Sequence, residues 1–182
     1  MAKAPIVVST RFVEECIAEN EALDPEQYLL EDPEGEKRYH LSLPEAVKRA
    51  RANRGHLLWG LTVYCTDHVH GGFETYKSIV EVNGGRCLLF RARPGSITST
   101  KTGFVGDEVE VAHCEEPKYV YLISGTTLQD EKLWTKFREM VQNVGKHPRI
   151  VKTDWMLDLA LSQEKRWDTM YEMTNNDIKT DD

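Results

Sequence analysis

A faint internal repeat constrains this sequence more than any other feature. Residues 5 to 18 read PIVVSTRFVEECIA, and residues 148 to 161 read PRIVKTDWMLDLAL. When the two segments are aligned at an offset of 143 residues, a proline (5 and 148), a valine (8 and 151) and a threonine (10 and 153) are identical. Phe12 aligns with Trp155. Each copy predicts a short β-branched strand followed by an amphipathic helix. We therefore expect two copies of one strand-and-helix unit in this chain.

The two threonines of the repeat stand at the predicted starts of the helices. A threonine in this position can accept hydrogen bonds from the first free N–H groups, so Thr10 and Thr153 are predicted helix caps. Phe12 and Trp155 follow two residues later, in the first helical turn, where each can pack against a sheet.

Hydrophobic periodicity and turn residues between the copies predict an α/β fold. The order is β-α-β-β-α-β-α, which implies a small, mostly parallel four-stranded sheet flanked by helices. An acidic surface loop with Asp-Pro turns is predicted over 19–38, and a Gly/Ser/Thr-rich insertion over 94–118, partly a strand around 109–112. The predicted elements are helices over 44–52, 73–82, 130–144 and 154–163, and strands over 56–65, 86–91, 119–124 and 149–152.

Charge and cysteine content exclude several classes of protein. The 182 residues include 23 Lys and Arg against 30 Asp and Glu, a net charge of −7, which argues against non-specific DNA binding. The cysteines lack a CxxC pair, so a reducing, intracellular compartment is expected. No apolar run approaches the roughly 18 residues of a membrane span, and the first residues lack the apolar core of a secretory signal. The cysteines are Cys16, Cys65, Cys87 and Cys114.

The element order, together with four residues, resembles a BRCT domain. Asn83-Gly84-Gly85 closes the 73–82 helix, and the two glycines allow close approach of helix and strand. Trp155 in the last helix fills the core between helix and sheet. The run GFETYKSIVEVNGGR over 72–86 further resembles the C-terminal repeats of fungal DNA-damage scaffolds of the Brc1 type and the regulator of Ty1 transposition.

This resemblance implies the C-terminal portion of a tandem BRCT pair. It implies a non-enzymatic, nuclear interaction module without cofactors, which binds a phosphorylated protein such as a phosphorylated histone tail, and other DNA-repair proteins. The alternative is a structural repeat that associates with another protein, or with itself, without phosphate recognition. The implied parts are a remnant of a preceding repeat over 1–30, a linker over 31–56, a complete repeat over 57–170 and a polar tail over 171–182.

The resemblance also implies where a peptide would bind. The family holds phosphate with a Ser or Thr and a backbone N–H of the first repeat's opening strand and a Lys of its second helix, and these elements are missing here. The second repeat contributes one side of the peptide groove. By motif position, its residues are Ile79, Thr153 and Leu157.

Thr66 occupies the corresponding hydroxyl position in the complete repeat. Lys132 or Lys136 could supply the cation of a phosphate pocket. However, Asp67 follows Thr66 where the family pattern has glycine, and a carboxylate there would repel phosphate. An ordinary strand-end threonine with solvated lysines is the favoured interpretation.

Three further clusters have both a functional and a purely structural interpretation, and we favour the structural one for each. Cys65, His68 and His70 could bind zinc with His113 or Cys114, but their spacing matches no strong metal motif. Asp154 and Asp158 suit a helix N-terminus and solvent better than paired acid catalysis. No Ser-His-Asp order, P-loop or GxGxxG occurs. A basic cluster suits a solvated linker helix better than a DNA contact: Lys48, Arg49, Arg51 and Arg54.

Overall fold

A computed structural model describes residues 6–97 and 117–179 of the chain, which divide into two compact units. Unit 1 comprises residues 1–54 and 158–165, and unit 2 comprises residues 55–157 and 166–182. Most of the predicted insertion over 94–118, including the strand expected around 109–112, lies outside the described residues. No helix in the described part combines the length and the apolar character that crossing a membrane requires.

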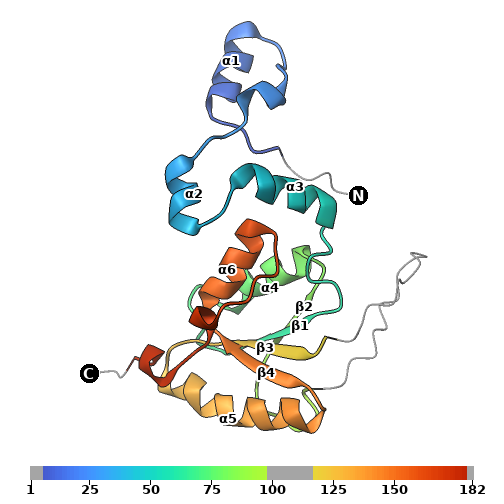
Figure 1. Cartoon of the computed structure of the whole chain (residues 1–182), viewed down its shortest axis with the longest axis vertical. Coiled ribbons are helices and arrows are strands. Elements are labelled where there is room, and N and C mark those ends of the chain that lie inside the picture. Colours follow the sequence, from blue (N-terminus) through green and yellow to red (C-terminus); the bar gives the residue numbers. More distant parts are fainter. Residues whose placement is uncertain (1–5, 98–116, 180–182) are drawn as a thin grey trace, which may run out of the picture. The chain divides into compact units, whose positions relative to one another are not determined.

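Unit 2 is built on a parallel sheet, which confirms the predicted α/β class. In the described residues the sheet has four strands in the order β2-β1-β3-β4, and every neighbouring pair is parallel. Parallel strands need long crossovers, and helices supply them. Helices α4 and α6 cover one face and α5 covers the other (Figure 1). The strands are β1 (Thr62–Cys65), β2 (Arg86–Leu89), β3 (Tyr119–Ile123) and β4 (His147–Val151).

The helices that follow the strands begin and end close to the predicted residues. They are α4 (Phe73–Val82), α5 (Leu128–Asn143) and α6 (Thr153–Ser162), and residues 158–162 of α6 belong to unit 1. Helix α5 begins two residues early because Thr127 and Asp130 form a capping box, in which each side chain accepts a hydrogen bond from the other's backbone N–H. Thr153 is the first residue of α6 itself.

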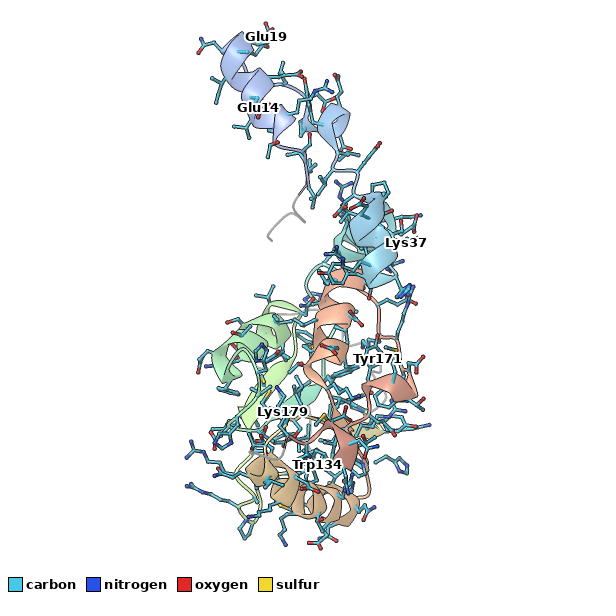
Figure 2. All side chains as sticks on the ribbon, turned by 90° about the vertical axis from the view of Figure 1, so that its left-hand side faces the viewer. Glu14, Glu19, Lys37, Trp134, Tyr171 and Lys179 are labelled. Carbon is cyan, nitrogen blue, oxygen red and sulfur yellow. The ribbon has the colours of Figure 1, made fainter. Side chains whose placement is uncertain are left out.

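The core of unit 2 lies on both faces of the sheet. On the α5 face, buried Trp134 (labelled in Figure 2) donates its indole N–H to Ser124 Oγ at 2.8 Å. On the opposite face, the Trp155 ring stacks on Tyr121 with centroids 4.3 Å apart and planes 11° apart. The cluster under α5 contains Tyr64, Phe90, Ile97, Val120, Leu122, Trp134, Phe137, Val141, Ile150 and Met173.

Unit 1 consists of short helices, and two predictions about it were wrong. The strand expected before α1 is reduced to one antiparallel bridge, between Val8 and Leu29. Thr10 has helical backbone angles (φ −58°) and its side chain makes no cap hydrogen bond. The helices are α1 (Arg11–Glu19), the 3-10 turn η1 (Pro25–Tyr28), α2 (Pro33–Tyr39) and α3 (Leu43–Asn53).

The acidic segment over 19–38 is also more ordered than predicted. Each Asp-Pro pair starts a helix rather than a simple turn. The Asp24 carboxylate accepts a hydrogen bond from the Glu26 N–H at 3.1 Å and caps η1. The Asp32 carboxylate accepts one from the Gly35 N–H at 2.9 Å and caps α2. Aspartate before proline satisfies both rules for a helix start, an N-cap acceptor and a residue without an N–H in the first turn.

Candidate functional site

The Thr66 hydroxyl, the candidate phosphate ligand, is enclosed by the fold. Thr66 follows β1 and is 0% exposed, and its Oγ1 accepts a hydrogen bond from the Gly125 N–H at 2.9 Å. The hydroxyl also lies close enough to the Asp130 carboxylate to affect its pKa, and that carboxylate is itself 0% exposed. The Thr66 hydroxyl is therefore buried within unit 2 and bonded to its backbone.

The Asp130 carboxylate gives this position a negative charge. Burial alone would raise the pKa of Asp130, but hydrogen bonds from the hydroxyls of Thr127 and Thr66 and from the Thr127 N–H outweigh it and hold the pKa below its usual value. His68 Nδ1 lies 3.5 Å from the carboxylate and lowers the pKa further. A phosphate at Thr66 would meet this buried anion, so the geometry opposes phosphate binding here.

The two lysines proposed for the same pocket lie on the exposed side of α5. The Lys136 ammonium pairs with Glu139 at 3.3 Å. Among the described residues, neither Lys132 nor Lys136 contacts Thr66 through a hydrogen bond or an ion pair. The structure thus does not bring the predicted hydroxyl and cation together.

Replacing Asp130 with asparagine should lower the free energy of unfolding at neutral pH. It should also make that free energy depend less on pH in the acid range. Because the pKa of Asp130 is lowered on folding, its ionised form stabilises the native state above the usual value of 3.8, and this contribution is lost as the pH falls through the folded-state pKa. We expect Asp130→Asn to cost about 1–3 kcal/mol at pH 7, the range for a disrupted buried hydrogen-bonding group. Urea unfolding at pH 7, 5, 4 and 3 measures both effects.

The matched control for this prediction is Glu139→Gln, which removes an exposed carboxylate from the same helix. It should leave the unfolding free energy and its pH dependence close to those of the parent chain, because an exposed ion pair contributes little. If the unfolding free energy fell equally between pH 7 and pH 3 in the parent chain and in Asp130→Asn, Asp130 would not be the titrating group.

The three residues assigned to the peptide groove lie on neighbouring helices. Burial raises the pKa of Tyr76 on α4, and the nearby Thr153 side chain at the start of α6 opposes this shift, so these two residues lie close together. Ile79 is three residues beyond Tyr76, and Leu157 is four residues beyond Thr153, which places each pair on one helix face. Leu157 is 39% exposed, and Ile79 is partly buried.

The glycines and tryptophan of the BRCT-like pattern lie where close packing needs them. Gly84 has φ +81°, and a Cβ there would lie 2.6 Å from the Gly55 carbonyl oxygen. A Cβ on Gly85 would lie 2.8 Å from Val80 Cγ1. Trp155 is 3% exposed. These residues pack closely within the core.

The cysteine and histidine cluster does not form a metal site in the described residues. Cys65 is buried, and its Sγ lies 3.5 Å from Cys87 Sγ across neighbouring strands. His68 faces Asp130 instead. No group of three potential metal ligands occurs in residues 6–97 and 117–179, and His113 and Cys114 lie outside them.

The basic cluster contacts acidic and carbonyl groups within unit 1. Arg49 Nε donates to the Ser162 carbonyl at the C-terminal end of α6 at 2.8 Å. Arg51 lies 3.6 Å from Glu26, and Lys48 lies 3.8 Å from Glu45. Arg54 is the left-handed residue after α3. Asp154 lies in the first turn of α6, as predicted, and Asp158 is partly buried on the same helix.

The structure extends the internal repeat beyond the segment that the sequence pattern showed. The backbone contacts of residues 7–30 reproduce those of residues 150–173 at the offset of 143. Asn20 and Gln163, also 143 apart, both end their helices in the left-handed conformation (φ 51° and 54°). We call these two segments the first and second closing units. Their matched hydrogen bonds are Ser9 N–H to Tyr28 O (2.8 Å) with Lys152 N–H to Tyr171 O (2.9 Å), and Leu30 N–H to Val7 O (3.0 Å) with Met173 N–H to Ile150 O (2.9 Å).

The antiparallel bridges Val8–Leu29 and Val151–Glu172 follow the same offset. So do the two tyrosines that end the 3-10 turns, Tyr28 in η1 and Tyr171 in η2 (Thr169–Tyr171; Tyr171 is labelled in Figure 2). The tyrosines were a sequence signal for the longer repeat, because they lie 143 residues apart and each follows an aspartate that caps its turn.

The chain was compared with known protein families, with characterised proteins and with solved structures. No model of a known protein family matches the chain. The BRCT-containing protein 1 of Schizosaccharomyces pombe is 30% identical over 164 residues, which are 88% of this chain and 17% of that protein, so the chain spans about a sixth of its length. The crystal structure of the S. pombe Brc1 BRCT5-BRCT6 domains has 28% identity and a TM-score of 0.65, over 95% of this chain and 74% of that one. The complex structure of Rtt107p and phosphorylated histone H2A, at 12% identity and a TM-score of 0.51, shares the fold over 94% of this chain and 67% of that one.

Proposed function

We propose that this chain, which belongs to the BRCT domain family, is the C-terminal part of a two-repeat module that binds a phosphorylated protein. The module is an interaction domain and not an enzyme, and the BRCT domains that it resembles are interaction domains too. One observation carries the proposal: residues 6–97 and 117–179 contain the closing unit of the BRCT fold twice, with matching hydrogen bonds, but its sheet only once. Two closing units imply two repeats.

The phosphate site of this module belongs to the preceding repeat. In the complete repeat, the Thr66 hydroxyl at the equivalent position is buried, accepts a hydrogen bond from the Gly125 N–H and lies beside the buried Asp130 carboxylate. The complete repeat instead contributes an apolar surface to the peptide groove. Its residues are Ile79, Thr153 and Leu157, and they read a side chain or carboxylate a few residues beyond the phosphate.

The ligand that best fits this arrangement is a phosphorylated histone tail. Rtt107p, which shares the fold, was solved as a complex with phosphorylated histone H2A. A histone ligand places the protein in the nucleus, among DNA-damage scaffolds such as its relative in S. pombe. The net charge of −7 agrees with a protein ligand better than with direct DNA binding.

Peptide titration tests this proposal. We compare the 182-residue chain with a two-repeat chimera, in which the fifth BRCT domain of S. pombe Brc1, without its last strand and helix, is fused ahead of Ile6. Labelled histone H2A tail peptides, phosphorylated and unphosphorylated, are the probes. We expect the chain alone to bind both peptides equally weakly, and the chimera to bind the phosphorylated peptide at least about tenfold more tightly, a difference of 1.4 kcal/mol.

Two variants decide which residues are responsible. Leu157→Glu should weaken binding of the phosphorylated peptide by the chimera, because it puts a charge into the apolar surface, whereas Leu128→Glu, at another exposed leucine, should not. Tight phosphate-dependent binding by the chain alone, abolished by Thr66→Ala, would contradict the proposal. Equal binding of both peptides by a folded chimera would instead favour a structural repeat that associates without phosphate recognition.

A further inference from the structure

The Arg149 side chain on β4 lies between two aromatic rings. Its guanidinium carbon lies 3.7 Å from the centre of the Tyr119 ring and 3.6 Å from the centre of the Trp167 ring. Two rings this close to one carbon atom occupy the two faces of the planar guanidinium, which stacks favourably on aromatic rings. The edge of the group, which carries its N–H donors, is what remains to meet a ligand.

The register of the sheet brings these side chains together. Arg149 is aligned with Tyr121 on β3, and Tyr119 lies two residues before Tyr121 on the same strand. Such residues project from the same face of the sheet, which is the face on which Trp155 stacks on Tyr121. The Trp167 ring reaches this face from the segment after α6, with its centre 6.3 Å from that of Tyr121. All five residues belong to unit 2.

The edge of the Arg149 guanidinium has donors to spare. Of its five N–H groups, one on Nη1 donates to the Tyr121 hydroxyl at 3.3 Å. In residues 6–97 and 117–179, Arg149 has no other hydrogen-bond acceptor and forms no ion pair, whereas Arg49, Arg51 and Arg91 each pair with a carboxylate. The parallel N–H groups of Nε and Nη2 are therefore unbonded, and Arg149 is partly exposed, so a ligand can reach them.

The surroundings of Arg149 are basic, although the whole chain is acidic. Residues 117–121 and 145–149, which contain the starts of β3 and β4, include no aspartate or glutamate. The two strands are neighbours in the sheet (Figure 1), so their first residues lie at the same end of it. The carboxylate of Asp168, beyond the Trp167 ring, accepts a hydrogen bond from the Met170 N–H at 2.9 Å and caps η2. The basic residues in the two segments are Lys118, Lys146, His147 and Arg149.

We propose that Arg149 binds a carboxylate in an acidic segment of a partner protein. The two oxygens of a carboxylate match the parallel N–H groups of Nε and Nη2, and such bidentate, charge-assisted pairs are stronger than hydrogen bonds between neutral groups. One guanidinium balances the single charge of a carboxylate, whereas a phosphate carries nearly two charges. The two rings hold the guanidinium in one orientation, so binding costs little conformational freedom. This contact goes beyond the proposed peptide groove and needs no phosphate.

NMR of the 182-residue chain tests this site through the Nε–H signal of Arg149, which is assigned by its absence from the spectrum of Arg149→Lys. The probe is a short peptide rich in aspartate, and the control peptide has asparagine in place of each aspartate. We expect the aspartate peptide, at constant ionic strength, to shift the Arg149 signal and the asparagine peptide to leave it unchanged. Inorganic phosphate at the same ionic strength should shift the signal less than the aspartate peptide does.

Two variants separate a bidentate contact from simple attraction of charge. Arg149→Lys keeps the positive charge but loses the paired donors, so it should bind the aspartate peptide at least about tenfold more weakly. Arg138→Gln removes an exposed positive charge from α5, on the other face of the sheet, and should change the affinity by less than about twofold. Circular dichroism confirms that both variants are folded before they are titrated.

Three results would overturn the proposal. An Arg149 signal that does not respond to millimolar aspartate peptide would show that the side chain only joins the Trp167 segment to the sheet. Equal affinities of Arg149→Lys and the parent chain would show that charge alone attracts the peptide. Tighter binding of a phosphoserine peptide, or of a single-stranded oligonucleotide of equal charge, would show that the site prefers phosphate. The first measurement uses the parent chain, so it decides the question even if Arg149→Lys does not fold.

Discussion

Replacing Trp155 with alanine should unfold unit 2 at moderate temperature. Trp155 is 3% exposed, its ring stacks on Tyr121 at 4.3 Å, and its indole N–H donates to the Arg166 carbonyl at 3.3 Å. Loss of a buried tryptophan costs about 3–5 kcal/mol through lost burial and the remaining cavity. Because a domain of this kind has a total stability of about 5–15 kcal/mol, this loss removes a large share of it.

The repeat supplies the matched control, Phe12→Ala, at the equivalent position of the first closing unit. Phe12 is only partly buried, and its ring contacts Tyr28 at 5.5 Å. We expect Phe12→Ala to change the unfolding free energy of unit 2 by less than about 0.5 kcal/mol, the usual range for substitutions away from a core. Urea unfolding compares the two variants. It is monitored by far-UV circular dichroism, because one variant lacks a tryptophan whose fluorescence would otherwise report unfolding. Similar losses in both would contradict the assignment of Phe12 to an uncovered unit.

Most of unit 2 could be predicted from the sequence because its signals are local. Helix α4 begins and ends at the predicted residues, since glycine breaks precede and follow a clear helical period. The strand expected over 56–65 is shorter, because Gly60 has φ +75° and the Leu58 N–H donates to the Asn83 carbonyl at 2.7 Å. Residues 57–60 form a turn there, in which only Leu57 and Leu58 are buried, and an apolar run alone does not distinguish such a turn from a buried strand.

The errors in unit 1 have a different physical cause. The expected strand over the first residues has the right side chains, but a strand needs a partner along its open edge, and the described residues provide only the bridge to Leu29. Local sequence cannot report the missing partner. The two Asp-Pro pairs were interpreted as turns, although the same dipeptide also starts a helix, as Asp24 and Asp32 do.

The candidate site shows the limit of position-based inference. Thr66 stands at the family position for a phosphate ligand, and Asp67 was the expected obstacle. The buried carboxylate beside Thr66 belongs instead to Asp130, which is 64 residues further along the chain and forms part of the capping box of α5. Such a contact depends on the packing of α5 against β1, which no local pattern specifies.

Backbone amides of the first closing unit should exchange their hydrogens much faster than the corresponding amides of the second. Their hydrogen bonds match in length: the Ser9 and Leu30 N–H groups bond at 2.8 and 3.0 Å, and the Lys152 and Met173 N–H groups both bond at 2.9 Å. Lys152 and Met173 lie in a covered unit, so their exchange requires unfolding of the sheet. Ser9 and Leu30 lie in an uncovered unit, which can open by itself.

Hydrogen–deuterium exchange of the 182-residue chain, resolved at these four amides by NMR at pH 7, tests the central claim most directly. That claim is that the chain holds one closing unit in a complete BRCT repeat and a second one without its sheet. We predict that Lys152 and Met173 exchange at least roughly a thousandfold more slowly than Ser9 and Leu30, after correction for intrinsic rates, as expected when slow exchange follows global unfolding. Equal protection of all four amides would contradict the account, because the first closing unit would then be as well covered as the second.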